Sequence, residues 1–441
     1  MRSLITPALG KAVRAVARLH GGGSALPGRI VEGFDPHFMA RTLGQLPLGV
    51  MMVSGTNGKT TTTRMIAKTL ENLGLKVFTN PTGSNFTRGV VSSLIPLVDT
   101  HGHLDADIAV LELDEAYAVH FVREVKPRYA VLLNVMRDQL DRFGEIDTTA
   151  GLLAHVAAAT TGTLVLNRED RRIAALAEKS RAHTIQYFGL EANLRSSFPS
   201  DDDLHSQKTD SAAHSEGYRN LPADVTLSGV HDHSADFIVG RQNYSTEVKV
   251  SGVYNLFNAA AALSVVRAVI NDPLTQSTHP QLTATTTEEL LKALSTVTPA
   301  FGRGENIDVN GTDVELVLVK NPAGFRLALA SFDARTADTM IAINDEYADG
   351  RDMSWLWDVD FSSLRASGVA QVSGVRSWDM ALRLGYDDVA VGSVEPDLAA
   401  ALDAFVRLNP GVHKRIYCTY TAMLGIRKHL AELTQVKDVG V

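Results

Sequence analysis

The stretch SGTNGKTTTT at residues 54–63 combines glycines, a lysine and hydroxyls in a spacing that suits phosphate binding. Gly55 and Gly58 would let backbone N–H groups converge on a phosphate, because glycine has no Cβ to obstruct them. Lys59 would reach the terminal phosphates of a nucleoside triphosphate, and the Thr60 hydroxyl would bind Mg²⁺. The common phosphate-binding motif separates its glycines by four residues. This loop has two residues between Gly55 and Gly58 and is therefore shorter.

Acidic residues that follow two apolar runs are candidate metal ligands. LELDEA provides Glu112, Asp114 and Glu115, and NVMRDQLDRFGE provides Asp138 and Asp141. Residues 112 and 114 would share one face of a strand, so both carboxylates would point into one cleft. Each cluster also suits the start of a helix, where an acidic side chain acts as a cap. Because both clusters follow consecutive expected strands, we favour Glu112 as a Mg²⁺ ligand.

The strands and helices that would position these residues can be predicted from the sequence. From residue 48 onward, apolar runs that suit strands alternate with segments of helical periodicity. A helix is expected from Lys59, with Met65, Ile66 and Leu70 on its apolar side. Nearly unbroken apolar runs are typical of strands that are buried on both faces of a parallel sheet. We therefore expect an α/β domain with strands at 48–55, 108–114, 129–134 and 162–167.

The later part of the chain predicts an insertion and then a second unit. Residues 191–219 are polar and aperiodic, which indicates a long loop or insertion. Alternation returns at 244–252, before an alanine-rich helix from about Asn255 to Val269 and a surface connection at 271–285. Strand–helix repetition resumes near residue 312, so we expect a second doubly wound unit with its boundary near 303–312.

Length, charge and cysteine content narrow the possible classes. A chain of 441 residues predicts two or three domains, and a net charge of −8 argues against broad affinity for nucleic acid. One cysteine, Cys418, excludes an intramolecular disulfide, and its surroundings favour a buried strand residue over a nucleophile. The N-terminal residues predict an amphipathic helix, which we expect to dock on the chain's own body rather than on a membrane surface.

The motifs resemble those of the Mur ligase family, ATP-dependent enzymes that join an amine to a carboxylate through an acyl phosphate. The central matches are SGTNGKTTTT, the strand end at Glu112, NVMRDQLDRFGE, LNRED (166–170), SGVYNLFNAAAAL (251–263) and FGRGE (301–305). Other stretches are most similar to the MurT type: LHGGGSALPGRI, NPTGSNFTRG (80–89), VKNPAGF (319–325), INDEYADGRDMSWLWDVDF (343–361), SGVRSWDMALRLGY (373–386) and TYTAML (419–424).

The resemblance implies an α/β fold with a Mur-ligase-like P-loop central domain, built on a mostly parallel sheet, and a C-terminal Rossmann-like α/β domain. It divides the chain into three parts: an N-terminal helix with a Gly-rich loop (1–45), a central ATP-binding domain (46–305) and a C-terminal MurT-type ligase domain (306–441). The polar insertion at about 191–219 would belong to the central domain.

MurT-type proteins are synthetase subunits of lipid II isoglutaminyl synthases, so the resemblance also implies a function. The chain would amidate the α-carboxylate of D-glutamate in the lipid II stem peptide, giving D-isoglutamine, with ATP and Mg²⁺. A separate glutaminase subunit of the GatD type would form a heterodimer with it and supply ammonia from glutamine. The resemblance implies a cytoplasmic protein that acts at the inner face of the cell membrane.

The family motifs also imply the residues of the nucleotide site. Thr60 and Glu112 would bind the metal ion, and Asn255 and Asn258 would line the adenine site, with Asn258 the stronger candidate. The residues implied to hold ATP are Gly55, Thr56, Asn57, Gly58, Lys59, Thr60, Thr61, Asn255 and Asn258.

Four residues are implied in the chemistry itself. Arg303 of FGRGE would approach the γ-phosphate, where a guanidinium matches developing negative charge; it also suits an interdomain surface. Lys320 would face the nucleotide from a strand end. Asp349 and Asp352 follow a strand, and a carboxylate there would orient ammonia or accept its excess proton. The alternative for both is a loop held by Asx turns, and the resemblance favours Asp352.

The sequence departs from the family pattern in three places. Gln139 stands where many Mur ligases have histidine. Those ligases also have a modified lysine some way after that position, whereas this chain has no lysine between Arg142 and Arg168. Many MurT-type chains carry a four-cysteine zinc ribbon where this chain has the polar segment 191–219, so zinc is not expected. The metal arrangement of the amino-acid-adding ligases is therefore not carried over to this chain.

Two other functions remain open on the residues. The first is an amino-acid-adding ligase of the same superfamily, such as a folylpolyglutamate-type synthetase. The second is a binding protein that uses ATP as a switch without ligation. The acidic strand ends and Arg303 favour ligation over a switch, because they suit phosphoryl chemistry.

Overall fold

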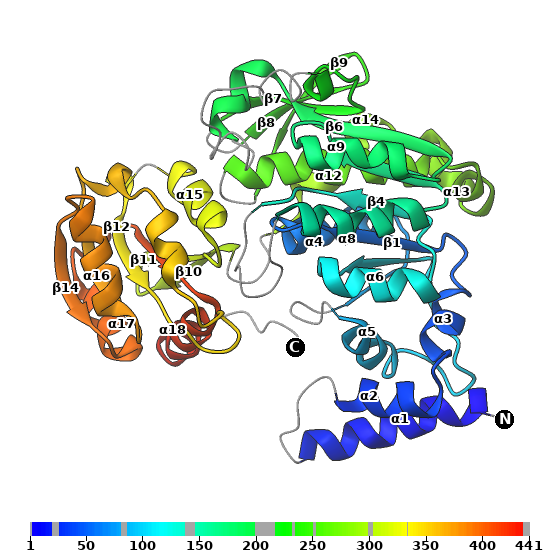
Figure 1. Cartoon of the computed structure of the whole chain (residues 1–441), viewed down its shortest axis with the longest axis horizontal. Helices are drawn as coiled ribbons and strands as arrows, with labels where there is room; N and C mark the ends of the chain where they lie inside the picture. The colour runs from blue at the N-terminus through cyan, green and yellow to red at the C-terminus, as the bar shows by residue number, and fades with distance from the viewer. Residues whose placement is uncertain are drawn as a thin grey trace.

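Two β-sheets, each covered by helices, organise the chain (Figure 1). The computed structural model describes residues 2–19, 26–80, 86–136, 146–198, 217–231, 234–249, 253–298, 303–332 and 334–434. The smaller sheet and its helices form a lobe beside the larger one (Figure 1). The expectation of an α/β fold with two mostly parallel sheets is confirmed.

Among the described residues, the larger sheet has nine strands in the order β2-β3-β1-β4-β5-β6-β7-β8-β9. It is parallel from β2 to β7 and antiparallel at β8 and β9. The strands are β1 (Val50–Ser54), β2 (Val77–Thr79), β3 (Ile108–Glu112), β4 (Tyr129–Leu132), β5 (Thr163–Asn167), β6 (Thr184–Leu190), β7 (Val225–Val230), β8 (Ser234–Val239) and β9 (Gln242–Glu247). Since β1 lies between β3 and β4, the loop after β1 opens where the strand order changes direction, the usual place for a ligand in such sheets.

Alternate residues of the central strands enter two separate hydrophobic cores, which explains their unbroken apolar runs. In β1, Met51 and Val53 pack with one core, whereas Val50 and Met52 pack with the other. The first core is closed by α4 (Lys59–Asn72), α12 (Val253–Ile270) and α14 (Thr287–Ser295). The second is closed by α3 (Phe38–Leu43), α5 (Thr87–Leu94), α6 (Glu115–Glu124) and α8 (Ile146–Ala159).

The remaining elements of this part are short connections. They are α9 (Arg171–Ala174), α13 (Pro273–Thr278), and the 3₁₀ turns η1 (Ala175–Lys179), η2 (Ala192–Ser197) and η3 (Pro280–Ala284). The surface connection expected at 271–285 is thus made of α13 and η3. Of the insertion expected at 191–219, residues 199–216 lie outside the described residues.

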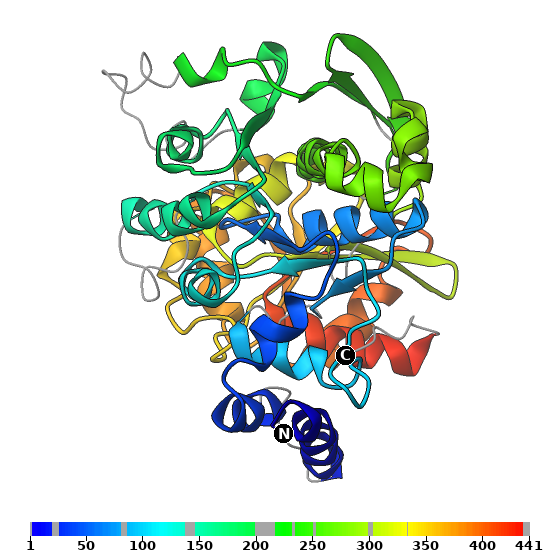
Figure 2. The same ribbon diagram turned by 90° about the vertical axis from the view of Figure 1, so that its right-hand side faces the viewer.

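Two N-terminal helices, α1 (Arg2–Leu19) and α2 (Leu26–Phe34), form a hairpin at one end of the molecule (Figure 2). The Thr6 hydroxyl donates a hydrogen bond of 2.8 Å to the Asp35 carboxylate. Lys11 Nζ donates to the Val98 carbonyl oxygen at 2.7 Å. These contacts dock α1 on the chain's own body, as expected. No helix among the described residues is both long enough and apolar enough to cross a membrane.

Within the described residues, the smaller sheet has six strands in the order β10-β11-β15-β12-β13-β14, parallel except at β10. They are β10 (Arg303–Val309), β11 (Thr312–Leu318), β12 (Asp338–Ala342), β13 (Val369–Ser373), β14 (Val391–Glu395) and β15 (Lys414–Cys418). The helices and 3₁₀ turns around it are α15 (Pro322–Ala330), α16 (Ser377–Tyr386), α17 (Leu398–Arg407), α18 (Tyr420–Leu433), η4 (Ala334–Thr336), η5 (Ser354–Asp358) and η6 (Ser362–Leu364).

The two sheets meet where α15 faces the loop after β1 (Figure 1). Asn321 Nδ2 donates to Asn57 Oδ1 at 3.2 Å, a hydrogen bond between residues 264 positions apart. Beside it, Met136 of the larger part packs against Ala323 and Leu327 of α15. A cleft between the two sheets is therefore lined by residues from both of them.

Candidate active site

The loop between β1 and α4 is shaped by two glycines with positive φ. Gly55 has a φ of 133° and Gly58 a φ of 88°. A Cβ on Gly55 would lie 2.9 Å from the Asn134 carbonyl oxygen, and one on Gly58 would lie 2.5 Å from Asn258 Oδ1. Both positions therefore require glycine for conformation and for space. The loop leads directly into α4, whose first N–H groups form an anion-binding end.

The same loop is held by residues that follow β4. Asn57 N–H donates to Asn134 Oδ1 at 2.8 Å, and Asn134 Nδ2 donates back to the Asn57 carbonyl oxygen at 3.0 Å. Thr56 N–H donates to the Asn134 carbonyl oxygen at 3.0 Å. Asp170 holds Val135, the residue after Asn134, by accepting its N–H at 2.7 Å. Burial raises the pKa of Asp170 to about 6. The loop is thus preorganised by hydrogen bonds of its neighbours.

Lys59 lies buried at the start of α4, among oxygen atoms. Its Nζ donates to the Gly55 carbonyl oxygen at 2.7 Å and lies 3.1 Å from Asp114 Oδ1 and 3.6 Å from Glu115 Oε2. Two carboxylates thus hold the ammonium group beside the glycine loop. A lysine in this place can balance the charge of a phosphate that the loop binds.

Thr60, the residue after Lys59, meets Glu112 at the end of β3. The Thr60 hydroxyl donates to Glu112 Oε1 at 2.9 Å, and both side chains are buried. Asn80 fixes the backbone of Glu112 from both sides, donating to its carbonyl oxygen at 2.9 Å and accepting its N–H at 3.0 Å. A hydroxyl and a carboxylate side by side are hard oxygen ligands of the kind that Mg²⁺ takes, together with phosphates and water.

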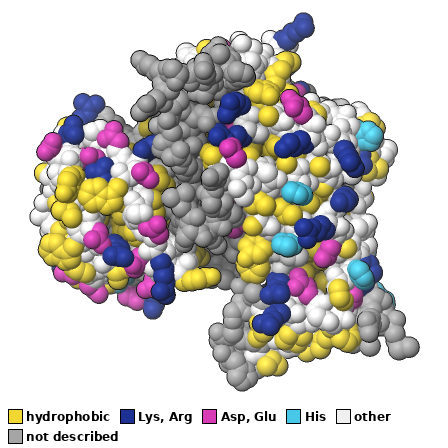
Figure 3. Space-filling view, in the orientation of Figure 1, with side chains coloured by type: hydrophobic (Ala, Val, Ile, Leu, Met, Phe, Trp, Pro, Cys, Tyr) yellow, Lys and Arg dark blue, Asp and Glu magenta, His cyan; other side chains and the backbone are white. Residues whose placement is uncertain are grey.

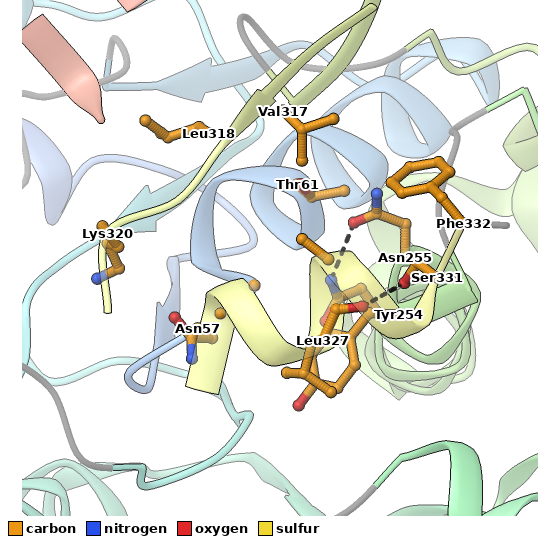
Figure 4. A pocket seen from close by; sticks show the side chains of 14 residues that line it. Asn57, Thr61, Tyr254, Asn255, Val317, Leu318, Lys320, Leu327, Ser331 and Phe332 are labelled. Carbon is orange, nitrogen blue, oxygen red and sulfur yellow. Dashed lines mark hydrogen bonds between the residues drawn. The ribbon is translucent and has the colours of Figure 1, made fainter. Parts of the chain in front are cut away.

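A cavity next to the loop is lined from both sheets (Figure 4). Asn255 and Asn258 of α12 line it on one side, and Asn258 Nδ2 donates to Asn255 Oδ1 at 3.3 Å. Lys320 lines it on the other side, between β11 and α15. The full lining is Asn57, Gly58, Thr61, Tyr254, Asn255, Asn258, Val317, Leu318, Lys320, Gly324, Leu327, Ala328, Ser331 and Phe332. Amide groups on mostly apolar walls suit a flat polar heterocycle.

We expect Gly58→Ala to weaken ATP binding by about tenfold, since a left-handed alanine costs about 1–2 kcal/mol. The added Cβ would also displace Asn258 from the cavity. Calorimetric titration with ATP and Mg²⁺ measures the effect. Gly74→Ala is the matched control, because Gly74 has a φ of 94° but no atom within 4 Å of its Cβ position. ATP affinity of the Gly58 variant equal to that of the unchanged chain would disprove this role for the loop.

Asp349 and Asp352 lie in different surroundings. Asp349 is buried; its Oδ1 accepts the Thr421 N–H at 2.7 Å and its Oδ2 accepts the Glu346 N–H at 3.1 Å. Asp352 is exposed and accepts the Ser354 N–H at 2.9 Å. Hydrogen bonds from the Ser354 hydroxyl and backbone lower the pKa of Asp352. An Asx turn, our alternative for this loop, is thus present at Asp352, whereas Asp349 accepts from a residue three positions earlier and from α18.

Asp352 lines a second cavity, in which Lys320 does not take part. Its walls come from η5 and α16 and hold charged and aromatic side chains. They are Arg351, Asp352, Met353, Ser354, Leu356, Trp357, Arg376, Asp379, Leu382 and Arg383. Three arginines beside Asp352 and Asp379 make this a strongly polar site next to an apolar wall.

The structure thus brings together Gly55–Thr61, Glu112, Asn255, Asn258 and Lys320, and separates them from the Asp352 cavity. Arg303 begins β10, but its side chain lies outside the described residues, as do Asp138, Gln139 and Asp141. Cys418 is buried at the end of β15, and burial raises the pKa of its thiol.

Sequence reasoning missed four asparagine or tyrosine side chains of the site: Asn80, Asn134, Asn321 and Tyr254. A polar residue directly after an apolar run was the available signal for Asn134, and Asn321 follows such a run after Lys320. Asn321 also caps α15 by accepting the Gly324 N–H at 2.7 Å. Nothing local distinguishes Asn80, whose partner Glu112 lies 32 residues away.

The residues present fit a nucleoside triphosphate with a divalent cation. The glycine cradle excludes any Cβ, Lys59 lies beside it, and Thr60 and Glu112 offer oxygen ligands. Among the described residues no group of three or more His, Cys, Asp or Glu side chains could hold a metal ion. The cation would therefore need ligands from the phosphates or water in addition to Thr60 and Glu112.

Two family models match the chain. A model described as the Mur ligase middle domain matches residues 53–266, and one described as the MurT ligase C-terminal domain matches residues 318–423. A curated relative from Streptococcus pneumoniae is described as "Lipid II isoglutaminyl synthase (glutamine-hydrolyzing) subunit MurT". It is 28% identical over 93% of this chain and 93% of its own length.

Solved structures of low sequence identity share the fold. MurF from Acinetobacter baumannii is 19% identical, with a TM-score of 0.67 over 92% of this chain and 80% of its own. MurF ligase from Thermotoga maritima in complex with ADP is 16% identical, with a TM-score of 0.65 over 90% of this chain and 84% of its own.

Proposed function

The chain belongs to the Mur ligase family and, within it, to the MurT type, and from this premise we propose its reaction. It is an ATP-dependent carbon–nitrogen ligase, the synthetase subunit of a lipid II isoglutaminyl synthase. It amidates the α-carboxylate of D-glutamate in the lipid II stem peptide to D-isoglutamine. The amidation takes place in the cytoplasm at the inner face of the cell membrane, where the lipid carrier holds the substrate.

One observation carries the proposal: Asn57 and Gly58 of the glycine loop and Lys320 line one cavity between the two sheets, and the Thr60–Glu112 pair lies at the end of the same loop. A ligase needs a phosphate cradle on one side and a group that acts on the transferred phosphate on the other. The hydrogen bond from Asn321 to Asn57 supports such a closed arrangement, because it joins the two sheets across the cleft.

When bound, ATP would supply the phosphoryl group that turns the substrate carboxylate into an acyl phosphate. Lys59 would balance the phosphate charge, and Thr60 with Glu112 would hold Mg²⁺. Asn255 and Asn258 would contact the adenine. Lys320, and Arg303 from β10, would stabilise negative charge on the phosphate as it transfers. The loop residues Thr56, Asn57 and Thr61 would complete the cradle.

Ammonia would then attack the acyl carbon, the bond to the phosphate oxygen would break, and phosphate would leave. An ionised carboxylate is needed to orient ammonia and accept its excess proton. Asp352 suits this role better than Asp349, since its carboxylate is exposed and lines a cavity, which the substrate would have to reach from the nucleotide cleft. The oxygens of Asp349 instead accept hydrogen bonds from the start of α18, at Thr421, and from the Glu346 N–H of its own turn.

The nitrogen source is proposed to be a glutaminase subunit of the GatD type. Within this chain the one cysteine, Cys418, is buried and has a raised thiol pKa, so it does not suit nucleophilic attack on glutamine. This supports our assignment of glutamine hydrolysis to a partner subunit, whose ammonia exit should open near Asp352 so that little free ammonia escapes.

An aromatic face beside the Asp352 cavity supports the docking of that partner there. Trp378, Leu382 and Tyr386 recur at four-residue spacing on α16 and are 67%, 58% and 69% exposed. Trp357 of η5 packs edge-on against Tyr386, with ring centroids 5.1 Å apart. Exposed Trp and Tyr side chains on one face are typical of protein-binding hot spots.

We expect Trp378→Ala to weaken the affinity for the glutaminase subunit by about thirtyfold, the loss typical of one hot-spot residue. Calorimetric titration of the two purified subunits measures it. Leu433→Ala, which removes an exposed apolar side chain from α18, is the matched control and should bind normally. Equal affinity of both variants would place the partner elsewhere.

The proposed function is tested by co-purifying the chain with a glutaminase subunit and assaying lipid II amidation with ATP and glutamine, then with ammonium. We expect amidation with glutamine only when the partner is present, and with ammonium in its absence too. ADP release that depends on an amino acid, without any glutaminase, would instead indicate an amino-acid-adding ligase. ATP binding without product from either nitrogen source would indicate an ATP-dependent switch.

A further inference from the structure

The helix α2 exposes an apolar stripe that the fold does not use. Leu26, Ile30 and Phe34 are 45%, 39% and 37% exposed, and their four-residue spacing puts them on one face. Val31, on the neighbouring buried face of the helix, is fully buried in the core with α5. The helix is thus apolar on two sides, and the outer side faces solvent.

The neighbouring helix α1 does not cover this stripe. It docks through the Thr6–Asp35 hydrogen bond and the bond from Lys11 to Val98. Gly10 lies so close to the core that a Cβ there would be 3.0 Å from Ile95 and 3.1 Å from Val31. These contacts put the inner side of α1 against the same core as Val31, and they leave the outer face of α2 exposed.

The hairpin is basic in an acidic protein. Residues 1–41 contain six Lys or Arg and two Asp or Glu, a net charge of +4, whereas the other 400 residues carry 36 and 48, a net charge of −12. Both acidic residues are paired with arginine: Glu32 Oε2 lies 3.1 Å from Arg88 Nε, and Asp35 Oδ2 lies 2.6 Å from Arg41 Nη2. In Figure 3 hydrophobic side chains line the lower edge of the molecule, with Lys and Arg above them.

We infer that the α1–α2 hairpin docks on an anionic lipid surface, with Leu26, Ile30 and Phe34 entering the interfacial layer. An apolar stripe with basic residues around it is the combination that binds such surfaces, by burial of apolar area and by attraction to anionic headgroups. Arg29 lies on α2 between Leu26 and Ile30 and is exposed, so its charge would reach the headgroups.

Charge favours a lipid surface over a second copy of this chain. A copy would bring the same positive hairpin, and like charges would repel. The stripe also lacks Trp and Tyr and lies on one short helix, whereas a protein interface usually covers about 800 Å² on each partner. The inference goes beyond the proposed reaction, although docking here would hold the chain beside a lipid-linked substrate.

The test is co-sedimentation of the full-length chain with vesicles. We expect binding to vesicles of phosphatidylglycerol mixed with phosphatidylcholine and little binding to phosphatidylcholine alone. The double variant Ile30→Gln with Phe34→Gln should bind at least about tenfold less, since two apolar side chains no longer enter the interface. Arg29→Gln should bind about fivefold less, with a weaker dependence on salt.

The matched control is Leu424→Gln with Leu433→Gln on α18, whose side chains are 41% and 40% exposed. It should bind vesicles like the unchanged chain, and all variants should keep the unchanged melting temperature. Equal vesicle binding by both double variants would overturn the inference. It would also be overturned if the unchanged chain formed a dimer that the α2 substitutions disrupt and the α18 substitutions do not.

Failure of this inference can be told apart from failure of the proposed function by a second assay. Amidation of a water-soluble muropeptide needs no membrane, so the α2 double variant should turn it over at the normal rate. Loss of vesicle binding with normal turnover of the soluble substrate supports the inference. No turnover by the unchanged chain would refute the proposed function and leave the vesicle result standing.

Discussion

Replacing Lys59 by methionine is expected to lower ATP-dependent amidation by about a hundredfold to a thousandfold, the loss typical of removing one preorganised charge at a reacting centre. Lys59 Nζ lies beside the Gly55 carbonyl, between the glycine loop and two carboxylates. Without it, Asp114 and Glu115 would repel the phosphates that the loop is meant to hold. The measurement is the initial rate of amide formation at saturating ATP, with ATP affinity determined in parallel.

Two further variants separate this effect from a loss of folding. Removing a lysine from a buried charge cluster leaves carboxylates unpaired and can destabilise a protein by about 3–5 kcal/mol. Lys59→Met combined with Glu115→Gln relieves one of these charges and should regain melting temperature without regaining activity. Lys68→Met removes an exposed lysine of the same helix, paired with Glu71, and should leave turnover unchanged. Normal turnover by a folded Lys59→Met variant would exclude the lysine from phosphate binding.

Replacing Asp352 by asparagine is expected to abolish amidation, by about a hundredfold or more, while ATP binding survives. Asparagine keeps the oxygen that accepts the Ser354 N–H, so the turn should remain as it is. It lacks the negative charge and the basic oxygen that would receive a proton from ammonia. Calorimetry with ATP and a turnover assay with ammonium measure the two properties separately.

The chain offers a matched control for this substitution. Asp360 is also exposed and accepts the Ser362 N–H at 2.8 Å, so Asp360→Asn changes the same type of turn eight residues away. It should turn over normally. Asp349→Asn should mainly lower the melting temperature, because Asp349 is buried and holds the start of α18. Near-normal amidation by Asp352→Asn would reassign the carboxylate.

Much of the fold follows from apolar patterning, and its failures have a physical reason. Strands β1, β3, β4 and β5 are buried on both faces and appear as unbroken apolar runs. Strands β6 and β9 lie partly exposed, with polar residues at intermediate or exposed positions, so the same criterion missed β6 and blurred the bounds of β9. β10 was missed because it lies within the expected boundary at 303–312, and it joins the second sheet antiparallel to β11.

The residues of the candidate site likewise fall into those that could be predicted from the sequence and those that could not. The loop, Thr60 and Glu112 could be predicted because each lies next to a strand end, where sequence order fixes position. The brace formed by Asn134 and Asn57 depends on pairing of residues 77 positions apart, which no local pattern contains. The burial and the contacts of Asp349 and Asp352 could not be predicted from the sequence either. One is buried against α18 and the other lines a cavity, although they are three residues apart.

The most direct test of the proposed reaction uses lipid II whose D-glutamyl α-carboxylate carries ¹⁸O. If the carboxylate is phosphorylated and ammonia displaces the phosphate, one labelled oxygen per turnover passes to inorganic phosphate, in equal amount with ADP and the new amide. Mass spectrometry of the phosphate gives the answer. Label in phosphate at this ratio is the predicted result. Amide formation with unlabelled phosphate would contradict an acyl phosphate, and the absence of amide with either nitrogen source would contradict the function itself.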